Sequence, residues 1–87
     1  MSKVLDFELI SPEGILFHDE ITELIALTDS GEVGILYNHA NLKAKLGKAP
    51  VRYTLANGTQ SSTIIDGGIL EVKDNHITIL TNSALVC

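Results

Sequence analysis

The side chains best suited to metal or acid–base chemistry in this 87-residue chain are three histidines and one cysteine: His18, His39, His76 and Cys87. Imidazole and thiolate groups are common zinc ligands, and ligand pairs usually lie a few residues apart on one element. No two of these histidines have such a spacing, and Cys87 is remote in sequence. The sequence therefore predicts no metal site and no cofactor, with the histidines in turns or on the exposed surface.

Enzyme motifs are not found in the sequence either. No serine lies in a nucleophile-elbow pattern, and there is no phosphate-binding loop or dinucleotide fingerprint. The adjacent carboxylates Asp19 and Glu20 are typical of a solvated strand end rather than of an acid–base pair. We therefore expect no catalytic residue.

Net charge and cysteine content oppose several further classes of function. A formal charge of −5, without any basic cluster, disfavours nucleic acid as a partner, because binding it requires Lys and Arg to neutralise phosphates. The same charge disfavours direct electrostatic attachment to a membrane. A single cysteine cannot form an internal disulfide, and no apolar run approaches the ~20 residues of a membrane helix. We expect a protein of a reducing compartment that is either soluble or peripheral to a membrane through a partner.

The elements that would position any site are predicted to be β-strands. Apolar and polar residues alternate over residues 5–9 and 51–55, the two-residue period of a strand with one buried face. The segment ITELIALT (21–28) is rich in β-branched residues and predicts a strand covered on both faces. The best helix candidate, residues 41–48, has no stop signal and runs into Pro50.

Turn signals separate these strands. Asn57-Gly58 is the strongest, because a type I′ hairpin turn needs positive φ at both central positions. Asp74-Asn75 is a weaker signal of the same kind, and residues 11–14 (SPEG) end the first strand.

Gly67-Gly68 interrupts an otherwise apolar stretch and predicts a bend or bulge. The residues that follow, Ile69, Leu70 and Val72, are expected in the core. Many short strands at close spacing predict one all-β domain over residues 1–87, a small sandwich or barrel.

Several motifs occur in a distinctive order: SPEGILF (11–17), GEVGILYNHANL (31–42) and DGGILEVKDNHITIL (66–80). Their order and spacing resemble the epsilon subunit of F-type ATP synthases over nearly the whole chain. Tyr37 and Asn41 stand where that family usually has proline, and Leu46-Gly47-Lys48 replaces its usual Leu-Lys-Pro-Gly turn. The residues that match are Pro12, Glu13, Gly14, Gly31, Glu32, Gly34, Ile35, His39, Ala40, Gly67, Gly68, Glu71 and Val72.

The resemblance implies a β-sandwich of about ten short strands in two sheets. It also implies a non-catalytic rotor subunit of the central stalk, which couples the gamma subunit to the c-ring in ion-driven ATP synthesis. Such a subunit is peripheral on the cytoplasmic face of the bacterial inner membrane or on the equivalent organellar membrane. The alternative from the residues alone is a stand-alone small β-sandwich that binds a peptide or small ligand, and a small hydrolase ranks third.

Two sets of contact residues follow from the resemblance. The c-ring loops would meet Ser30, Gly31, Glu32 and Val33, with Glu32 pairing to a basic side chain. The gamma subunit would meet Ser11, Asn38, His39 and Ala40. The residues alone favour a structural turn at 31–42, in which Asn38 and His39 bond their own backbone.

The family typically continues past the last strand into two helices that form a hairpin. The sequence ends at Cys87, so we expect a short form without the inhibitory C-terminal helices. Such a chain would neither inhibit ATP hydrolysis nor bind ATP through that hairpin.

Overall fold

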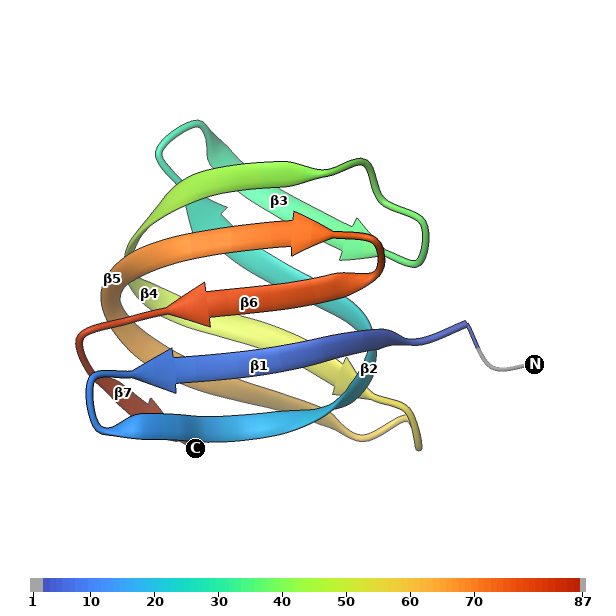
Figure 1. Cartoon of the computed structure of the whole chain (residues 1–87), viewed down its shortest axis with the longest axis horizontal. Coiled ribbons are helices and arrows are strands. Elements are labelled where there is room, and N and C mark those ends of the chain that lie inside the picture. Colours follow the sequence, from blue (N-terminus) through green and yellow to red (C-terminus); the bar gives the residue numbers. More distant parts are fainter. Residues whose placement is uncertain (1–2, 87) are drawn as a thin grey trace.

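The computed structural model describes residues 3–86, which contain seven β-strands and no helix (Figure 1). The prediction of an all-β fold is therefore confirmed, but the strands are fewer than the expected ten. They are β1 (Leu5–Ser11), β2 (Gly14–Thr28), β3 (Gly31–Leu36), β4 (Leu42–Leu55), β5 (Gln60–Lys73), β6 (His76–Leu80) and β7 (Ala84–Val86).

The strands form one continuous sheet in the order β1-β6-β5-β4-β2-β3, with β7 beside β5. Because β1 also pairs with β2, five of the strands close on themselves into a barrel-like sheet, as Figure 1 shows. The pairing of β1 with β6 is parallel, whereas the other pairs are antiparallel. β3 and β7 extend this closed sheet at its sides.

The lower strand count results from three long strands. β2, β4 and β5 contain 15, 14 and 14 residues and continue through bends instead of ending there. In β5 the bend is the predicted one at Gly67 and Gly68, whose φ angles of 76° and 149° suit glycine. A strand that bends in this way contributes to both halves of a sandwich, so fewer strands build the same architecture.

In β2, a bulge changes which residues face the core. The register with β4 shifts between Ile21 and Glu23, so that the buried residues are Ile21, Leu24 and Ala26. The expectation that both faces of this segment are covered is wrong, because Leu27 remains 47% exposed. The bulge explains why no simple alternation is visible in the sequence.

The core is aliphatic around one aromatic cluster. Phe7, Phe17 and Tyr53 pack with ring centroids 5.2–5.7 Å apart, a separation favourable for tilted rings. The hydroxyl of Tyr53 lies 3.2 Å from Thr63 Oγ1, so both buried hydroxyls have a partner. The apolar alternation of β1 is confirmed, since Leu5, Phe7 and Leu9 are buried.

The predicted turns lie where expected, although their geometry differs. Asp74 and Asn75 both have positive φ, 51° and 64°, so this weaker signal gives the two-residue turn. Between β4 and β5 only Gly58 has positive φ, 92°, in a longer loop. The prediction of a type I′ turn at Asn57-Gly58 is therefore wrong. The Leu55 N–H donates to Thr59 O, so a larger loop joins the two strands.

Candidate functional site

Four apolar residues, three exposed and one half-buried, form a row across the outer face of β2, β1, β6 and β5. The strand registers place Ile15 beside Ile10, Ile10 beside Leu80, and Leu80 beside Ile69. Ile15, Leu80 and Ile69 are 60%, 51% and 43% exposed. We call these four residues the apolar row. The expectation that Ile69 lies in the core is wrong, whereas Leu70 and Val72 are buried as expected.

An open hollow of about 700 Å³ borders the apolar row. Ile10, Ile69 and Leu80 give it apolar walls, while Lys43 and Lys45 from β4 add positive charge. Ser11, Pro12, Ala44, Gly68, Thr81 and Asn82 complete the lining. An apolar surface rimmed by charge is typical of a protein interaction site.

The four residues expected at the c-ring lie at the junction of β2 and β3. Ser30 is in the two-residue turn, and Gly31, Glu32 and Val33 begin β3. The Ser30 N–H donates to Thr28 Oγ1 (3.1 Å), and that hydroxyl donates to Gly31 O (2.8 Å). Gly31 has φ of 116°, which requires glycine there. Val33 packs partly against the core, while Glu32 is exposed. The structure therefore brings this set together and leaves Glu32 as its outward charge.

Glu32 has a partner within the chain. Arg52 Nη2 on β4 lies 3.0 Å from Glu32 Oε2, and both side chains are more than half exposed. Arg52 lies beside Ile25, and Ile25 lies beside Gly34. Because Gly34 has no side chain, the guanidinium can reach across β2 to Glu32.

The four residues expected to contact gamma lie at the two ends of β1. Ser11 ends β1 and lines the hollow. Asn38, His39 and Ala40 lie at the opposite end, where the Asn38 N–H donates to Asn75 Oδ1 (2.6 Å) and the Asp6 N–H donates to Asn75 O (2.9 Å).

Hydrogen bonds within the loop fix His39. Its Nδ1 lies 2.7 Å from Ala40 O, and its backbone N–H donates to Leu36 O (3.0 Å). The local backbone bond favoured by the residues alone is therefore present for His39. It is wrong for Asn38, whose side chain bonds Asn75, and Gly31–Leu36 form strand β3 and not part of a turn.

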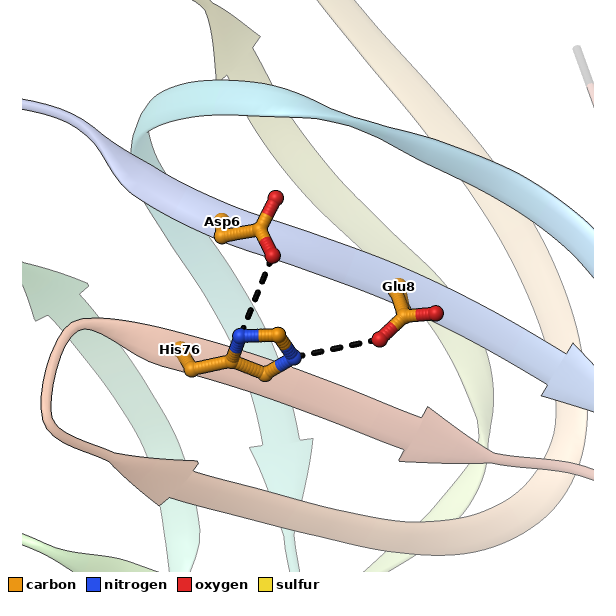
Figure 2. A group of neighbouring side chains, drawn as sticks. All are labelled: Asp6, Glu8 and His76. Atoms are coloured by element: carbon orange, nitrogen blue, oxygen red, sulfur yellow. Dashed lines mark hydrogen bonds and ion pairs between the residues drawn. The ribbon is translucent and has the colours of Figure 1, made fainter.

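Polar side chains of β2, β1 and β6 gather beside the apolar row, on the same outer face. The registers place Glu8 beside His18, and Asp6 beside His76. His76 Nδ1 lies 3.0 Å from Asp6 Oδ2 and its Nε2 lies 3.1 Å from Glu8 Oε1, as Figure 2 shows. His18 Nε2 lies 2.8 Å from Asp6 Oδ1, and this hydrogen bond raises the pKa of His18.

The family described as ATP synthase, Delta/Epsilon chain, beta-sandwich domain matches residues 4–86. The chain belongs to this family. Curated relatives named ATP synthase epsilon chain include those of Syntrophomonas wolfei, 40% identical over 77 residues, and Xanthomonas euvesicatoria, 41% identical over 78 residues. These matches cover 88% and 90% of this chain but 56% of each relative, so the chain spans about half the length of the curated relatives.

Solved structures share the fold at lower identity. A chain in the cryo-EM structure of Euglena gracilis mitochondrial ATP synthase (OSCP/F1/c-ring) matches with a TM-score of 0.90 at 20% identity, covering 97% of this chain and 54% of that one. A chain in the central stalk/c-ring structure of Tetrahymena thermophila mitochondrial ATP synthase gives 0.79 at 16% identity, covering 94% and 66%. Within residues 3–86, no helix is long and apolar enough to cross a membrane.

Sequence reasoning missed Arg52 and the cluster of Asp6, Glu8, His18 and His76. Both depend on which strands are neighbours. Arg52 and Glu32 are 20 positions apart in sequence. The cluster joins Glu8 to His76, which are 68 positions apart. The available signal for Arg52 was its outward position between inward Val51 and Tyr53. For the cluster, only the alternation of Asp6 and Glu8 with buried residues indicated a shared outer face.

Proposed function

We propose that this chain is the β-sandwich part of a non-catalytic rotor subunit in the central stalk of an F-type ATP synthase, where it couples the gamma subunit to the c-ring. The observation that carries the proposal is the apolar row beside its lysine-rimmed hollow, on a domain that belongs to the delta/epsilon family. Large apolar side chains left exposed on one sheet face are expected where another protein packs.

The gamma subunit is proposed to occupy the apolar row and the hollow, with Ser11 at their edge. Asn38, His39 and Ala40 are proposed as a second contact at the far end of β1. The seven residues of β1 span roughly 20 Å, so a partner touching both ends must lie along the strand. An elongated partner, such as a helix, would satisfy this requirement.

The end of the β2–β3 hairpin, with Ser30, Gly31, Glu32 and Val33, is proposed to meet the c-ring loops. Glu32 would reach them as a charge already paired with Arg52. An exposed pair of this kind contributes only ~0–1 kcal/mol, so exchanging Arg52 for a cation of the c-ring costs little. The contact would set orientation more than affinity.

The subunit would be attached to the cytoplasmic face of the bacterial inner membrane, or to the equivalent organellar membrane, through the complex and not through lipid. Its task is to transmit torque, which suits a closed sheet with a packed interior because close packing resists deformation.

Binding to the gamma subunit and to the detergent-solubilised c-ring tests the proposal. We expect a one-to-one complex with gamma by size-exclusion chromatography at micromolar concentrations. We also expect stronger retention of the gamma complex than of this chain alone on immobilised c-ring. If gamma stays free in the presence of both this chain and the c-ring, the rotor function is wrong.

A matched variant tests the c-ring contact separately. Glu32→Lys reverses the charge at the turn and places a cation opposite Arg52, so c-ring retention should fall while gamma binding stays unchanged. Glu13→Lys, in the exposed turn before β2, makes the same change of charge away from the β2–β3 turn. Equal loss of retention in both variants would indicate a general charge effect and contradict a specific role for Glu32.

A further inference from the structure

The cluster of Asp6, Glu8 and His76 has a geometry that the rotor function does not use. One ligand-type atom from each residue can be chosen so that all three lie within 4.8 Å of one another. The side chains come from β1 and β6 and point toward one another from the outer face of the sheet (Figure 2). Each nitrogen of the His76 ring faces a different carboxylate.

We propose that Asp6, Glu8 and His76 form a binding site for a borderline divalent transition-metal ion, with Zn²⁺ as its best-suited occupant. The ion would take one nitrogen of His76 in place of its proton, together with one oxygen from each carboxylate. The positions left open would be filled by water, as in zinc sites with three protein ligands.

The choice of metal follows from the ligands. An imidazole nitrogen suits Zn²⁺, Cu²⁺ and Ni²⁺, whereas Mg²⁺ and Ca²⁺ favour sites made wholly of oxygen. Two carboxylates give the site negative charge, and the ion pairs recorded for Asp6 and Glu8 within residues 3–86 are with histidines only. Lys73 lies beside His76 on the adjacent strand without an ion pair to these carboxylates.

His18 serves as a positioning residue in this arrangement. It hydrogen-bonds Asp6 Oδ1, while His76 lies against the other oxygen, Oδ2. The bond from His18 therefore fixes the rotation of the Asp6 carboxylate. Partners of this kind typically change metal affinity by 10–100-fold.

The site would join two strands that are about 70 positions apart in sequence. β1 and β6 pair in parallel, and no turn connects them directly. A metal that binds only the folded chain raises its stability by mass action, so the site would reinforce the closure of the sheet.

Competition with a chromophoric zinc chelator tests the site, on the whole chain in a Cys87→Ser background. That substitution removes the thiol as an alternative zinc ligand. We expect one Zn²⁺ per chain, and affinity at least tenfold weaker in His76→Gln and in Glu8→Gln. His18→Gln should weaken binding by about tenfold, and the matched control His39→Gln should leave it unchanged.

Thermal unfolding supplies the second readout. Zn²⁺ at ten times its Kd should raise the melting temperature by about 5–10 °C, and Ca²⁺ or Mg²⁺ at the same concentration should not. Equal zinc affinity in the His76→Gln and His39→Gln variants would overturn the proposal. So would an equal shift with Ca²⁺, because that would indicate general screening of acidic charge.

Discussion

The two ends of β1 meet the rest of the molecule in opposite ways. At the Ser11 end, apolar side chains of β2, β6 and β5 are exposed beside a hollow. At the other end, polar groups satisfy one another: Asn75 Nδ2 donates to Asn38 Oδ1 (3.1 Å), and the Asp74 N–H donates to Asn41 Oδ1 (3.4 Å). Both ends carry residues expected to contact the same partner. The Ser11 end exposes the continuous apolar row, whereas the exposed apolar residues at the other end are Leu36 (56%) and Tyr37 (40%), beside the hydrogen-bonded loop.

This difference separates affinity from orientation. Burial of apolar area provides most of the free energy of association, whereas groups already hydrogen-bonded gain little from a new polar partner. We therefore expect the Ser11 end, which exposes the apolar row, to supply most of the affinity for gamma, and the hydrogen-bonded Asn38 end to contribute mainly a rigid shape that sets its position.

The largest expected effect is at the bend that shapes the apolar end. A Cβ on Gly68 would collide with the backbone carbonyl oxygen of Leu80, and φ of 149° disfavours any other residue. Gly68→Ala should therefore lower the free energy of unfolding by about 3 kcal/mol or more, measured by urea denaturation. Gly47→Ala is the control, because a Cβ there meets nothing within 4 Å, and it should change stability by less than ~0.5 kcal/mol. Similar losses in both variants would refute this account of the bend.

The next effect concerns the apolar row itself. Leu80→Ser should weaken gamma binding by about 10–100-fold, or ~1.4–2.8 kcal/mol, without unfolding the chain, because Leu80 is half exposed. Leu27→Ser makes the same change at a similarly exposed leucine on β2 and should leave gamma binding unchanged. Isothermal titration calorimetry measures both. Unchanged affinity in the Leu80→Ser variant would show that gamma does not bind at the apolar row.

A smaller effect is expected at the polar end. Asn75→Ala removes two hydrogen bonds to Asn38 and forces alanine to adopt φ of 64°, so stability should fall by about 1–2 kcal/mol. Asn75→Gly permits that φ and isolates the loss of the hydrogen bonds. Thermal melting should rank the glycine variant between wild type and alanine. The reverse order would show that backbone strain is not part of the effect.

The last prediction concerns His18, in the cluster of Asp6, Glu8, His18 and His76 that lies between the two ends of β1. Because the hydrogen bond that His18 donates to the Asp6 carboxylate raises the pKa of His18 in the folded chain, the folded state holds that proton more tightly than the unfolded one. This contribution to stability is fully present below the ordinary imidazole pKa of 6.5 and is lost as pH rises through the folded value. The stability gap between wild type and His18→Gln, measured with chelator present, should therefore narrow from pH 5.5 to pH 8.5. A difference in stability that stays constant with pH would show that protonation of His18 is not coupled to folding.

Local features of the chain could be predicted from sequence because they depend on neighbouring residues. The alternation of Leu5, Phe7 and Leu9, the Asp74-Asn75 turn and the bend at Gly67-Gly68 each express a local preference, and all three are present. Strand lengths could not be predicted, because bulges and bends let β2 and β5 continue as long strands where several short ones were expected.

The site was predicted less completely for a related reason. The resemblance groups Ser30–Val33 as one contact surface, and the structure places these residues together at the β2–β3 junction. The motifs give no sign that Arg52 holds Glu32. They also give no sign that Ser11 and His39 lie at opposite ends of β1. These facts depend on the register of strands remote in sequence, which local patterns do not encode.

The parallel pairing of β1 with β6 also bears on how the chain reaches its fold. β1 is the first strand to be synthesised, yet one of its two partners begins at His76. Contacts of such long sequence separation require a large loop to close first, which slows folding to the millisecond-to-second range typical of all-β domains. During synthesis β1 can therefore pair first with β2, and the sheet closes only after β6 has left the ribosome.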